Sequence, residues 1–479
     1  MAPDCGGESR GAIPITFRGV SMHPVFVSAH KKTQATPIWF VHSGNLDSVQ
    51  KEIGERGRAF VATGGFEAKP GRLLLLPTAD GKLAGVLFGI EQPEGEIDRF
   101  RPGQLSGSLP PGTYRFASSP HDARLAALAF ALAAYQFTRY RKADTRKIHL
   151  VVPDGVDGDD LSRIVEGVTL CRDLTNTPSN DMGPAELEAA SRAFARRHGA
   201  KVKVTSGDAL AKSIPLVNAV GAGSARKPRL IDITWGRPSD PKITLVGKGV
   251  CFDTGGLDIK PDSGMLNMKK DMAGAATALA LAHMIIGRRL KVRLRVIIPA
   301  VENAISGTSF RPRDVYTSRR GISVEIGNTD AEGRLILADA LTLADEEKPA
   351  MIVDFATLTG AARVALGPDI PPFFTDDDAL ADALARAGST ENDPVWRMPL
   401  WRPYQAMLDS KVADLNNVGA GGHGGAITAA LFLRRFVSAK SWVHLDIFAW
   451  TPAAKPGRPE GAECQTARAL YAMLCKRYA

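Results

Sequence analysis

Short apolar segments alternate with longer amphipathic segments along the C-terminal two thirds of the chain. The apolar segments have the length and composition of buried strands, and they cover residues 229–234, 242–246, 292–298, 351–355 and 442–447. Segments with a helical apolar period lie between or after them, at residues 273–287, 335–346, 378–388, 426–437 and 464–477. Because parallel strands need helical crossovers, this alternation predicts a central, largely parallel or mixed sheet flanked by helices.

The N-terminal third has shorter apolar runs that are broken by glycine and proline. Strand-like runs cover residues 39–41, 73–76, 83–88 and 147–152, and a helical pattern covers about 121–140. Runs of this length with turn residues between them predict a small α/β domain.

The length of the chain, 479 residues, exceeds what one hydrophobic core usually serves, so we expect an α/β protein of two domains. A helical segment at 161–174 and a turn-rich stretch at 175–180 mark the junction. We therefore predict a smaller N-terminal α/β domain over 1–155, a linker helix and junction over 156–182, and a larger C-terminal domain over 183–479.

Composition narrows the class of protein. The net charge of +9 permits attraction to DNA, but no dense Lys/Arg block accompanies it, so a basic protein without nucleic-acid function is the simpler interpretation. The five cysteines are scattered and form no CxxC pair, which indicates a reducing cytoplasm and argues against a thiolate zinc site. The longest apolar stretch, 125–135, is about half the ~20 residues that span a bilayer, so we expect no membrane segment. We expect no secretory signal at the N-terminus, where Met22 is an alternative start.

Two short regions concentrate charged residues and glycines. The first runs from 246 to 256 and continues to Lys260 and Asp271; the second is 328–335. Together they supply four carboxylates, enough to neutralise two divalent cations: Asp253, Asp271, Asp330 and Glu332. Such hard oxygen ligands favour Mn²⁺, Mg²⁺ or Zn²⁺. In an extended segment, Asp330 and Glu332 would project to the same side.

Three basic residues accompany these carboxylates. Lys248 follows a predicted strand between two glycines, and burial beside two cations would favour its neutral amine, which could bind a metal. Lys260 and Arg334 would stay cationic and could stabilise an oxyanion, and Arg334 could also hold a small anion bidentately. Each residue alone could be a solvated or ion-paired side chain, but their joint clustering favours a metal-assisted hydrolytic site.

Other motifs give weaker signals. The glycine-rich stretch 419–424 matches GxGxxG, but we predict no strand before it, so a loop near the site is favoured over a dinucleotide site. The histidines lack HExxH spacing, and His444 lies in an apolar run typical of a core histidine. Cys251 has a strand context that indicates a small buried side chain.

The strings VGKGVCFDTGG at 246–256 and NTDAEGRL at 328–335 resemble the two signature regions of the leucyl aminopeptidase family, also called cytosol aminopeptidases, which are two-metal exopeptidases. Further similar stretches lie at 176–182, 354–361 and 444–447. The resemblance implies that the C-terminal domain is a catalytic, dinuclear metallopeptidase domain. It also implies a homohexamer.

Carried over residue by residue, the resemblance assigns a tighter metal to Lys248, Asp253, Asp271 and Glu332. It assigns a second, more exchangeable metal to Asp253, Asp330 and Glu332. Lys260 would polarise the substrate carbonyl, and Arg334 would position a bicarbonate that acts as general base. The substrate-binding positions implied are Met268, Asn328, Ala331, Thr357, Leu358 and Gly360.

Our interpretation is a cytoplasmic metal-dependent aminopeptidase that uses two Mn²⁺ or Zn²⁺ ions per chain. It would release N-terminal amino acids from peptides, with leucine-like or broad specificity, by attack of a metal-bridging hydroxide. One departure affects specificity: the family commonly continues the last strand as Asp-Ile-Ala-Gly, whereas Phe448 follows Ile447 here. Two alternatives are a DNA-binding accessory protein, suggested by the basic charge, and a catalytically silent scaffold, which the intact ligand set disfavours.

Overall fold

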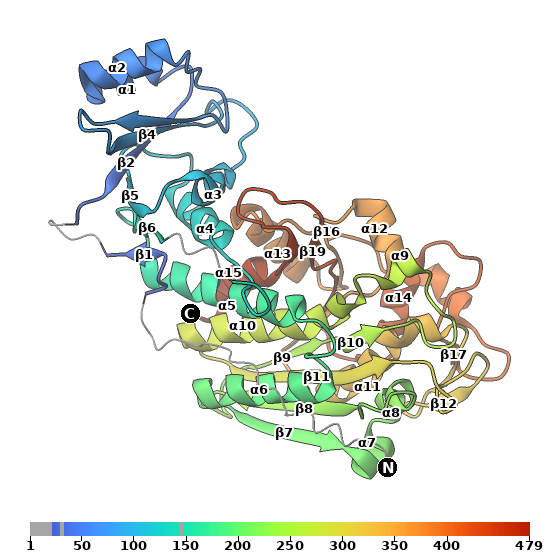
Figure 1. Cartoon of the computed structure of the whole chain (residues 1–479). Helices are drawn as coiled ribbons and strands as arrows, with labels where there is room; N and C mark the ends of the chain where they lie inside the picture. The colour runs from blue at the N-terminus through green and yellow to red at the C-terminus, as the bar shows by residue number, and fades with distance from the viewer. Residues whose placement is uncertain (1–21, 29–32, 143–146) are drawn as a thin grey trace, which may run out of the picture.

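The computed structural model describes residues 22–28, 33–142 and 147–479, and these form two α/β units. Figure 1 shows the smaller N-terminal unit standing at one end of the larger C-terminal unit. The sheets of both units are mixed and flanked by helices, which confirms the predicted fold class.

The N-terminal unit is built on a six-stranded sheet in the order β1-β6-β5-β2-β4-β3. Its strands are β1 (Phe26–Val27), β2 (Thr36–Val41), β3 (Leu73–Pro77), β4 (Leu83–Gly89), β5 (Gly112–Phe116) and β6 (Ile148–Val151). Side chains alternate between its two faces, so that Val41 and Leu87 pack with α1 (Leu46–Glu52) and α2 (Gly54–Thr63). Phe40 and Phe88 point to the other face, toward α4 (Ala123–Ala133).

Two helices join the units through a shared core. The long helix α5 (Gly158–Asn176) begins after Asp157, whose carboxylate accepts from the Asp160 backbone N–H at 2.9 Å. It packs along α10 (Ala273–Arg288), an almost wholly buried helix rich in alanine. Small side chains let the two helices approach closely, and their core continues into the N-terminal sheet.

The C-terminal sheet follows the order β16-β15-β18-β14-β9-β11-β8-β7, with β10 beside β11. Its strands are β7 (Lys201–Ser206), β8 (Arg229–Trp235), β9 (Lys242–Gly247), β10 (Gly249–Asp253), β11 (Arg293–Asn303), β14 (Met351–Ala356), β15 (Pro372–Phe374), β16 (Trp396–Arg397) and β18 (Trp442–Asp446). The central strands β18, β14, β9 and β11 are parallel, whereas β8 and β15 run antiparallel to their inner neighbours. All the central strands therefore end at one edge of the sheet.

Helices cover both faces of this sheet. One face packs against α5, α10, α6 (Pro184–His198), α13 (Asp378–Thr390) and α15 (Ala467–Tyr478). The other packs against α7 (Gly207–Ser213), α8 (Pro215–Gly221), α11 (Glu332–Asp345) and α14 (Gly425–Arg434). Burial on both faces explains why the central strands are continuous apolar runs. No described helix is long and apolar enough to cross a membrane.

Several predicted elements differ in extent. The helix expected over 121–140 ends at Ala133, and the strand expected over 292–298 continues to Asn303. The prediction that no strand precedes the glycine-rich stretch is wrong, because β17 (Leu415–Asn416) pairs with β13 (Ser323–Glu325). That strand lies in a three-stranded side sheet with β12 (Val315–Thr317), not in the central sheet.

A histidine pair between α6 and α10, with His283 buried and His198 half-buried, should make stability depend on pH. His198 Nε2 lies 3.1 Å from His283 Nδ1, and His283 Nε2 lies 3.4 Å from a Glu166 oxygen that also pairs with Arg197. Burial, with the neighbouring His283 and Arg197, lowers the pKa of His198 to about 3. A histidine whose folded pKa lies below its unfolded value loses stability as pH falls through the unfolded value near ~6.5.

We therefore expect the free energy of unfolding to fall by on the order of 1–2 kcal/mol more between pH 7.5 and 5.5 in the parent than in His198→Asn. Guanidinium titrations at both pH values measure this difference. His423→Gln, at an exposed position, is the control and should keep the parent trend. An unchanged trend in His198→Asn would show that His198 is not the group responsible.

Candidate metal centre

The predicted site residues lie where the central parallel strands end. Lys248 directly follows β9, and Asp253 is the last residue of β10. Thr357 follows β14, and Asp446 ends β18. Ligand sites gather beyond the carboxyl ends of strands in such sheets, so the backbone itself brings these separate segments together.

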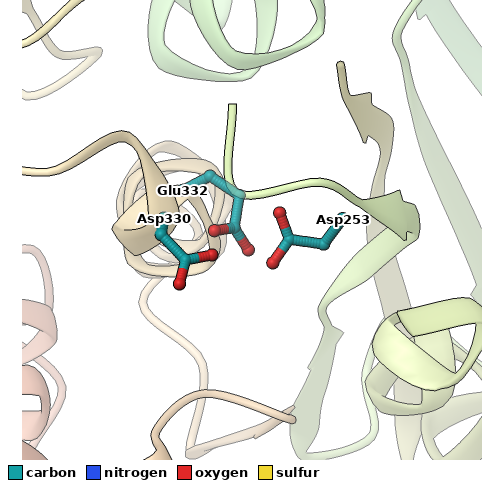
Figure 2. A group of neighbouring side chains, drawn as sticks. All are labelled: Asp253, Asp330 and Glu332. Carbon is teal, nitrogen blue, oxygen red and sulfur yellow. The ribbon is translucent and has the colours of Figure 1, made fainter. Parts of the chain in front are cut away.

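Three carboxylates converge at this edge. Asp253, Asp330 and Glu332 each offer an oxygen, and these oxygens all lie within 4.8 Å of one another. Figure 2 shows the three carboxylates turned toward a common centre. The premise of an extended segment at 330–332 is wrong: Asp330 lies in a 3-10 turn, η3 (Thr329–Ala331), and Glu332 opens α11. The helical turn, and not strand alternation, brings both side chains to Asp253.

The fourth carboxylate, Asp271, reaches this group through Lys248. Lys248 Nζ lies 2.8 Å from Asp271 Oδ2 and 2.9 Å from Glu332 Oε1, and it donates to the Thr357 carbonyl at 2.9 Å. A Cβ at Gly333 would lie 2.6 Å from Lys248 Cε, so only glycine lets the lysine approach here. Burial alone would lower the pKa of Lys248, but Asp271 and Glu332 raise it above its usual value.

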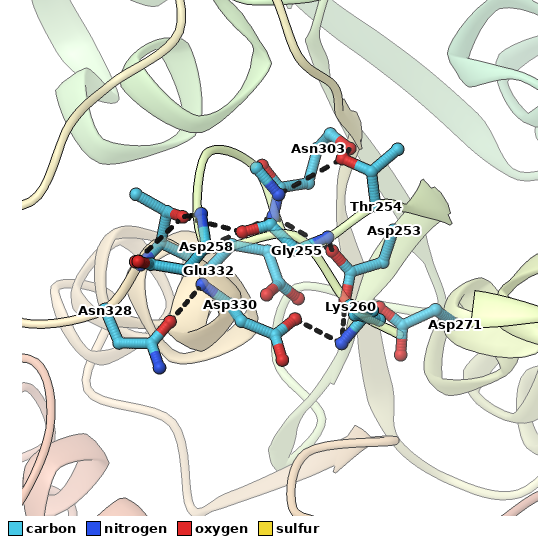
Figure 3. Close-up of polar contacts among 12 residues, drawn as sticks. Asp253, Thr254, Gly255, Asp258, Lys260, Asp271, Asn303, Asn328, Asp330 and Glu332 are labelled. Carbon is cyan, nitrogen blue, oxygen red and sulfur yellow. Dashed lines mark hydrogen bonds and ion pairs between the residues drawn. The ribbon is translucent and has the colours of Figure 1, made fainter. Parts of the chain in front are cut away.

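Lys260 lies between two of the converging carboxylates. Its amine is 2.9 Å from Asp253 Oδ2 and also pairs with Asp330 Oδ1 (Figure 3). Gly255 has a φ of +88°, and its backbone N–H donates to Asp253 Oδ1 at 2.9 Å. The tight turn that this glycine permits carries the chain from β10 back toward Lys260.

Arg334 is buried in the first turn of α11, and it forms no ion pair in the described part of the chain. Its Nη1 donates to the Asn417 carbonyl at 2.7 Å, while Nε is buried without a hydrogen-bond partner. Burial lowers the pKa of Arg334 to about 10, which leaves it cationic at neutral pH. The alternative of a simple salt bridge at a helix start therefore does not describe this residue.

Polar residues that were not predicted from the sequence link the segment after β10 to the η3 turn. Asn303, at the end of β11, donates to Asp253 Oδ1 at 2.9 Å and to the Thr329 carbonyl at 3.1 Å. Asp258 accepts from the Thr329 backbone N–H at 2.7 Å, and Asn417 donates to the Asn328 carbonyl at 2.7 Å. Asn303 follows an apolar strand just as Asp253 does, and that position was the signal that could have identified it.

The predicted substrate-side residues lie on three segments that carry or adjoin residues of this centre. Met268 opens the 3-10 helix η2 (Met268–Met272), which carries Asp271. Asn328 caps η3 by accepting from the Asp330 N–H at 2.7 Å, and Ala331 ends η3. The other three follow β14: Thr357, Leu358 and Gly360, the first residue of α12 (Gly360–Leu366).

The Thr357 hydroxyl is already engaged, because it donates to Asp271 Oδ1 at 2.6 Å. The backbone after it is held by Asp446, whose Oδ1 accepts from the Leu358 N–H at 3.1 Å. These two hydrogen bonds fix the β14–α12 loop beside the carboxylates.

The electrostatics of the carboxylate group favour a divalent cation. Burial, followed by the charge of Asp253, raises the pKa of both Glu332 and Asp330 above the usual range. Asp271 Oδ2 and Glu332 Oε1 are buried and contact only the Lys248 amine, and among the described residues Glu332 Oε2 is buried without any polar partner. Carboxylates that share one lysine carry more negative charge than that lysine balances, and crowded carboxylate oxygens are donors that Mn²⁺, Mg²⁺ and Zn²⁺ bind, so these residues fit the predicted metals.

Two other expectations concern residues outside this group. Cys251 is fully buried in β10, which confirms a small core side chain. His444 is fully buried in β18, and its Nδ1 contacts Asp354.

The fold and the site together define a class of protein: two-domain α/β proteins with a group of carboxylates, suited to divalent cations, at the strand ends. Comparison with known protein families identifies the family to which the chain belongs. The model of the cytosol aminopeptidase family catalytic domain matches residues 169–471, and that of the M17 aminopeptidase N-terminal domain matches 36–153. The chain belongs to the cytosol aminopeptidase family, as its signature strings indicated, and is a metal-dependent aminopeptidase.

Individual relatives support the same assignment. A probable cytosol aminopeptidase of Xylella fastidiosa (strain 9a5c) is 39% identical over 425 residues, covering 82% of this chain and 86% of the relative. The crystal structure of a cytosol aminopeptidase from Coxiella burnetii superposes with a TM-score of 0.90 at 44% identity, covering 95% of this chain and 100% of that one. The bottromycin maturation enzyme BotP in complex with Mn has a TM-score of 0.82 at 31% identity, covering 92% and 99%.

Proposed function

We propose that this aminopeptidase releases N-terminal residues from peptides at the centre formed by the ends of β9 and β10 and the start of α11. The observation that carries the proposal is the group of converging carboxylates, in which the buried Asp271 and Glu332 share the single ammonium of Lys248 and Glu332 Oε2 has no polar partner among the described residues. Buried unsatisfied carboxylates are costly unless a cation compensates them.

We assign one metal to Lys248, Asp253, Asp271 and Glu332, and a second to Asp253, Asp330 and Glu332. Shared ligands between two sites would hold the ions close together. When bound, two divalent ions supply Lewis acidity and activate a water for hydrolysis. Mn²⁺ or Zn²⁺ suits this mixed oxygen and nitrogen donor set, and the Mn complex of BotP supports the former.

The chain's own cations complete the chemistry. Lys260, whose amine already lies among the carboxylates, would polarise the substrate carbonyl and stabilise the negative charge that develops on its oxygen. Arg334 would orient a bicarbonate as general base, and its buried, unpartnered Nε supports a role in binding a small anion.

The substrate would lie along Met268, Asn328, Ala331, Thr357, Leu358 and Gly360, on the loops that border the centre. Binding of the free α-amino group near Asp330 explains why only chain ends are cut, because a blocked amine could not be oriented there. Leucine-like or broad side-chain specificity, a cytoplasmic location and assembly as a homohexamer complete the proposal.

Hydrolysis of aminoacyl-p-nitroanilides and dipeptides after metal removal tests this function. The stripped protein should be inactive, and added Mn²⁺ or Zn²⁺ should restore cleavage of free-amine substrates. N-acetylated versions of the same substrates are the control and should resist cleavage. Absence of turnover with either metal, despite two ions bound per chain, would contradict the proposal.

A further inference from the structure

A group of cationic and aromatic side chains lies beside the metal centre and has no part in the functions assigned above. It consists of Lys270, Arg363 and Phe448, which we call the cationic wall. Lys270 Nζ lies 4.6 Å from the centroid of the Phe448 ring, and the Arg363 guanidinium carbon lies 5.8 Å from it. Two cations therefore face one half-buried aromatic ring.

The cationic wall adjoins the proposed substrate loops. Lys270 immediately precedes Asp271 in η2. Arg363, on α12, donates through Nη2 to Asp446 Oδ1 at 3.1 Å, and the same oxygen accepts from the Leu358 N–H. Phe448 lies two residues beyond Asp446. The same polar contacts thus hold the wall and the β14–α12 loop in place.

Lys270 and Arg363 each have a donor group without a hydrogen-bond acceptor among the described residues. Lys270 is 6% exposed, and in the described part of the chain its amine forms neither an ion pair nor a hydrogen bond. Arg363 Nη1 is buried, also without a hydrogen-bond partner. A cation–aromatic contact compensates a buried charge only partly, whereas a carboxylate can accept from both groups at once.

We propose that the cationic wall selects peptides whose N-terminal side chain carries a carboxylate, glutamate or aspartate. The inference rests on the proposed peptide hydrolysis, and it replaces the leucine-like or broad preference with a preference for acidic N-terminal residues. The Phe448 ring occupies space where the family pattern has alanine, so a long apolar side chain has less room. A short anionic side chain would instead reach the two unpartnered donors.

Glutamate and glutamine p-nitroanilides provide the test, because they differ in charge but hardly in shape. We expect the Mn²⁺-loaded enzyme to cleave the glutamate substrate with a kcat/KM about tenfold or more above that for glutamine, as for a hydrogen-bonded charged group. Leucine p-nitroanilide is measured alongside. Cleavage of leucine with glutamine equal to or better than glutamate would overturn the inference and leave the proposed function intact. Cleavage of none of the three would instead count against the proposed function.

Variants of the wall locate the effect. Lys270→Met should lower the glutamate-to-glutamine ratio by about tenfold, whereas Lys270→Arg, which keeps the charge, should retain most of it. Lys269→Met is the matched control: it removes the same charge one residue away, from an amine that donates to the Asn176 carbonyl at 2.8 Å. That control should keep the parent ratio. An equal loss on all substrates in Lys270→Met, with the ratio unchanged, would contradict the role of Lys270.

Discussion

Replacing Glu332 with glutamine should abolish peptide hydrolysis while leaving the fold intact. The substitution keeps the size of a fully buried side chain and removes the charge that our assignment shares between both metals. Loss of one ligand common to two sites should lower kcat/KM by more than about 10³-fold, well beyond the ~10–100-fold typical of changes to groups that merely orient ligands. Hydrolysis assays and elemental analysis of bound metal measure the two effects together.

The control for this variant is Glu347→Gln, just beyond the same helix, where the side chain is 48% exposed. It makes the same chemical change away from the centre and should keep two metals and full activity. Circular dichroism of both variants establishes that they are folded. A folded Glu332→Gln protein that retained both metals and a tenth of the parent activity would show that Glu332 is not a shared ligand.

The positions of the site residues relative to the sheet could be predicted from the sequence. The strands before Lys248 and Thr357 are continuous apolar runs because helices bury both faces of the sheet. Such runs are visible without any knowledge of their partners, and a polar residue, Lys248 or Thr357, follows each run at the same edge of the sheet. The first charged cluster and the 357–360 segment could thus be assigned to the same edge of the sheet, whereas the second cluster, on η3 and α11, follows no predicted strand.

The local conformation of the second cluster could not be predicted in the same way. A two-residue spacing suits an extended chain, but Asn328 caps the 3-10 turn instead, and Glu332 continues it into α11. The capping hydrogen bond joins the Asn328 side chain to the backbone N–H two residues later, so an Asn directly before an acidic helical turn was a signal that strand periodicity obscured.

Long-range polar contacts were beyond sequence reasoning altogether. Asn303 and Asp253 are separated by 50 residues, and Asn417 and Asn328 by 89, yet each pair forms a buried or half-buried hydrogen bond. No local pattern in one segment specifies the partner in the other, because the sheet order determines which strand ends meet.

The predicted limits of the domains, at residues 155 and 182, also stay predictions.

Lys260→Ala should lower kcat by about 10²–10³-fold without loss of bound metal, as expected when a donor to a developing oxyanion is removed. The Lys260 amine pairs with Asp253 and Asp330, two of the proposed ligands. Metal ions would compete with the lysine for these oxygens and free its amine to face the substrate. Removing the amine therefore removes a competitor, and metal affinity should stay equal or increase. Steady-state kinetics and metal titration of the variant measure both quantities.

A joint loss of bound metal and activity in Lys260→Ala would indicate a structural role for Lys260 and not a catalytic one. If Lys260 served mainly to hold the two carboxylates in position, the alanine variant would lose metal and activity together, and excess Mn²⁺ would restore both. Under the catalytic assignment, excess metal restores nothing, because the missing group acts on the substrate. Lys242→Ala, which removes an exposed amine at the start of β9, is the control and should match the parent in both assays. The response of kcat to added metal in Lys260→Ala thus separates the two roles.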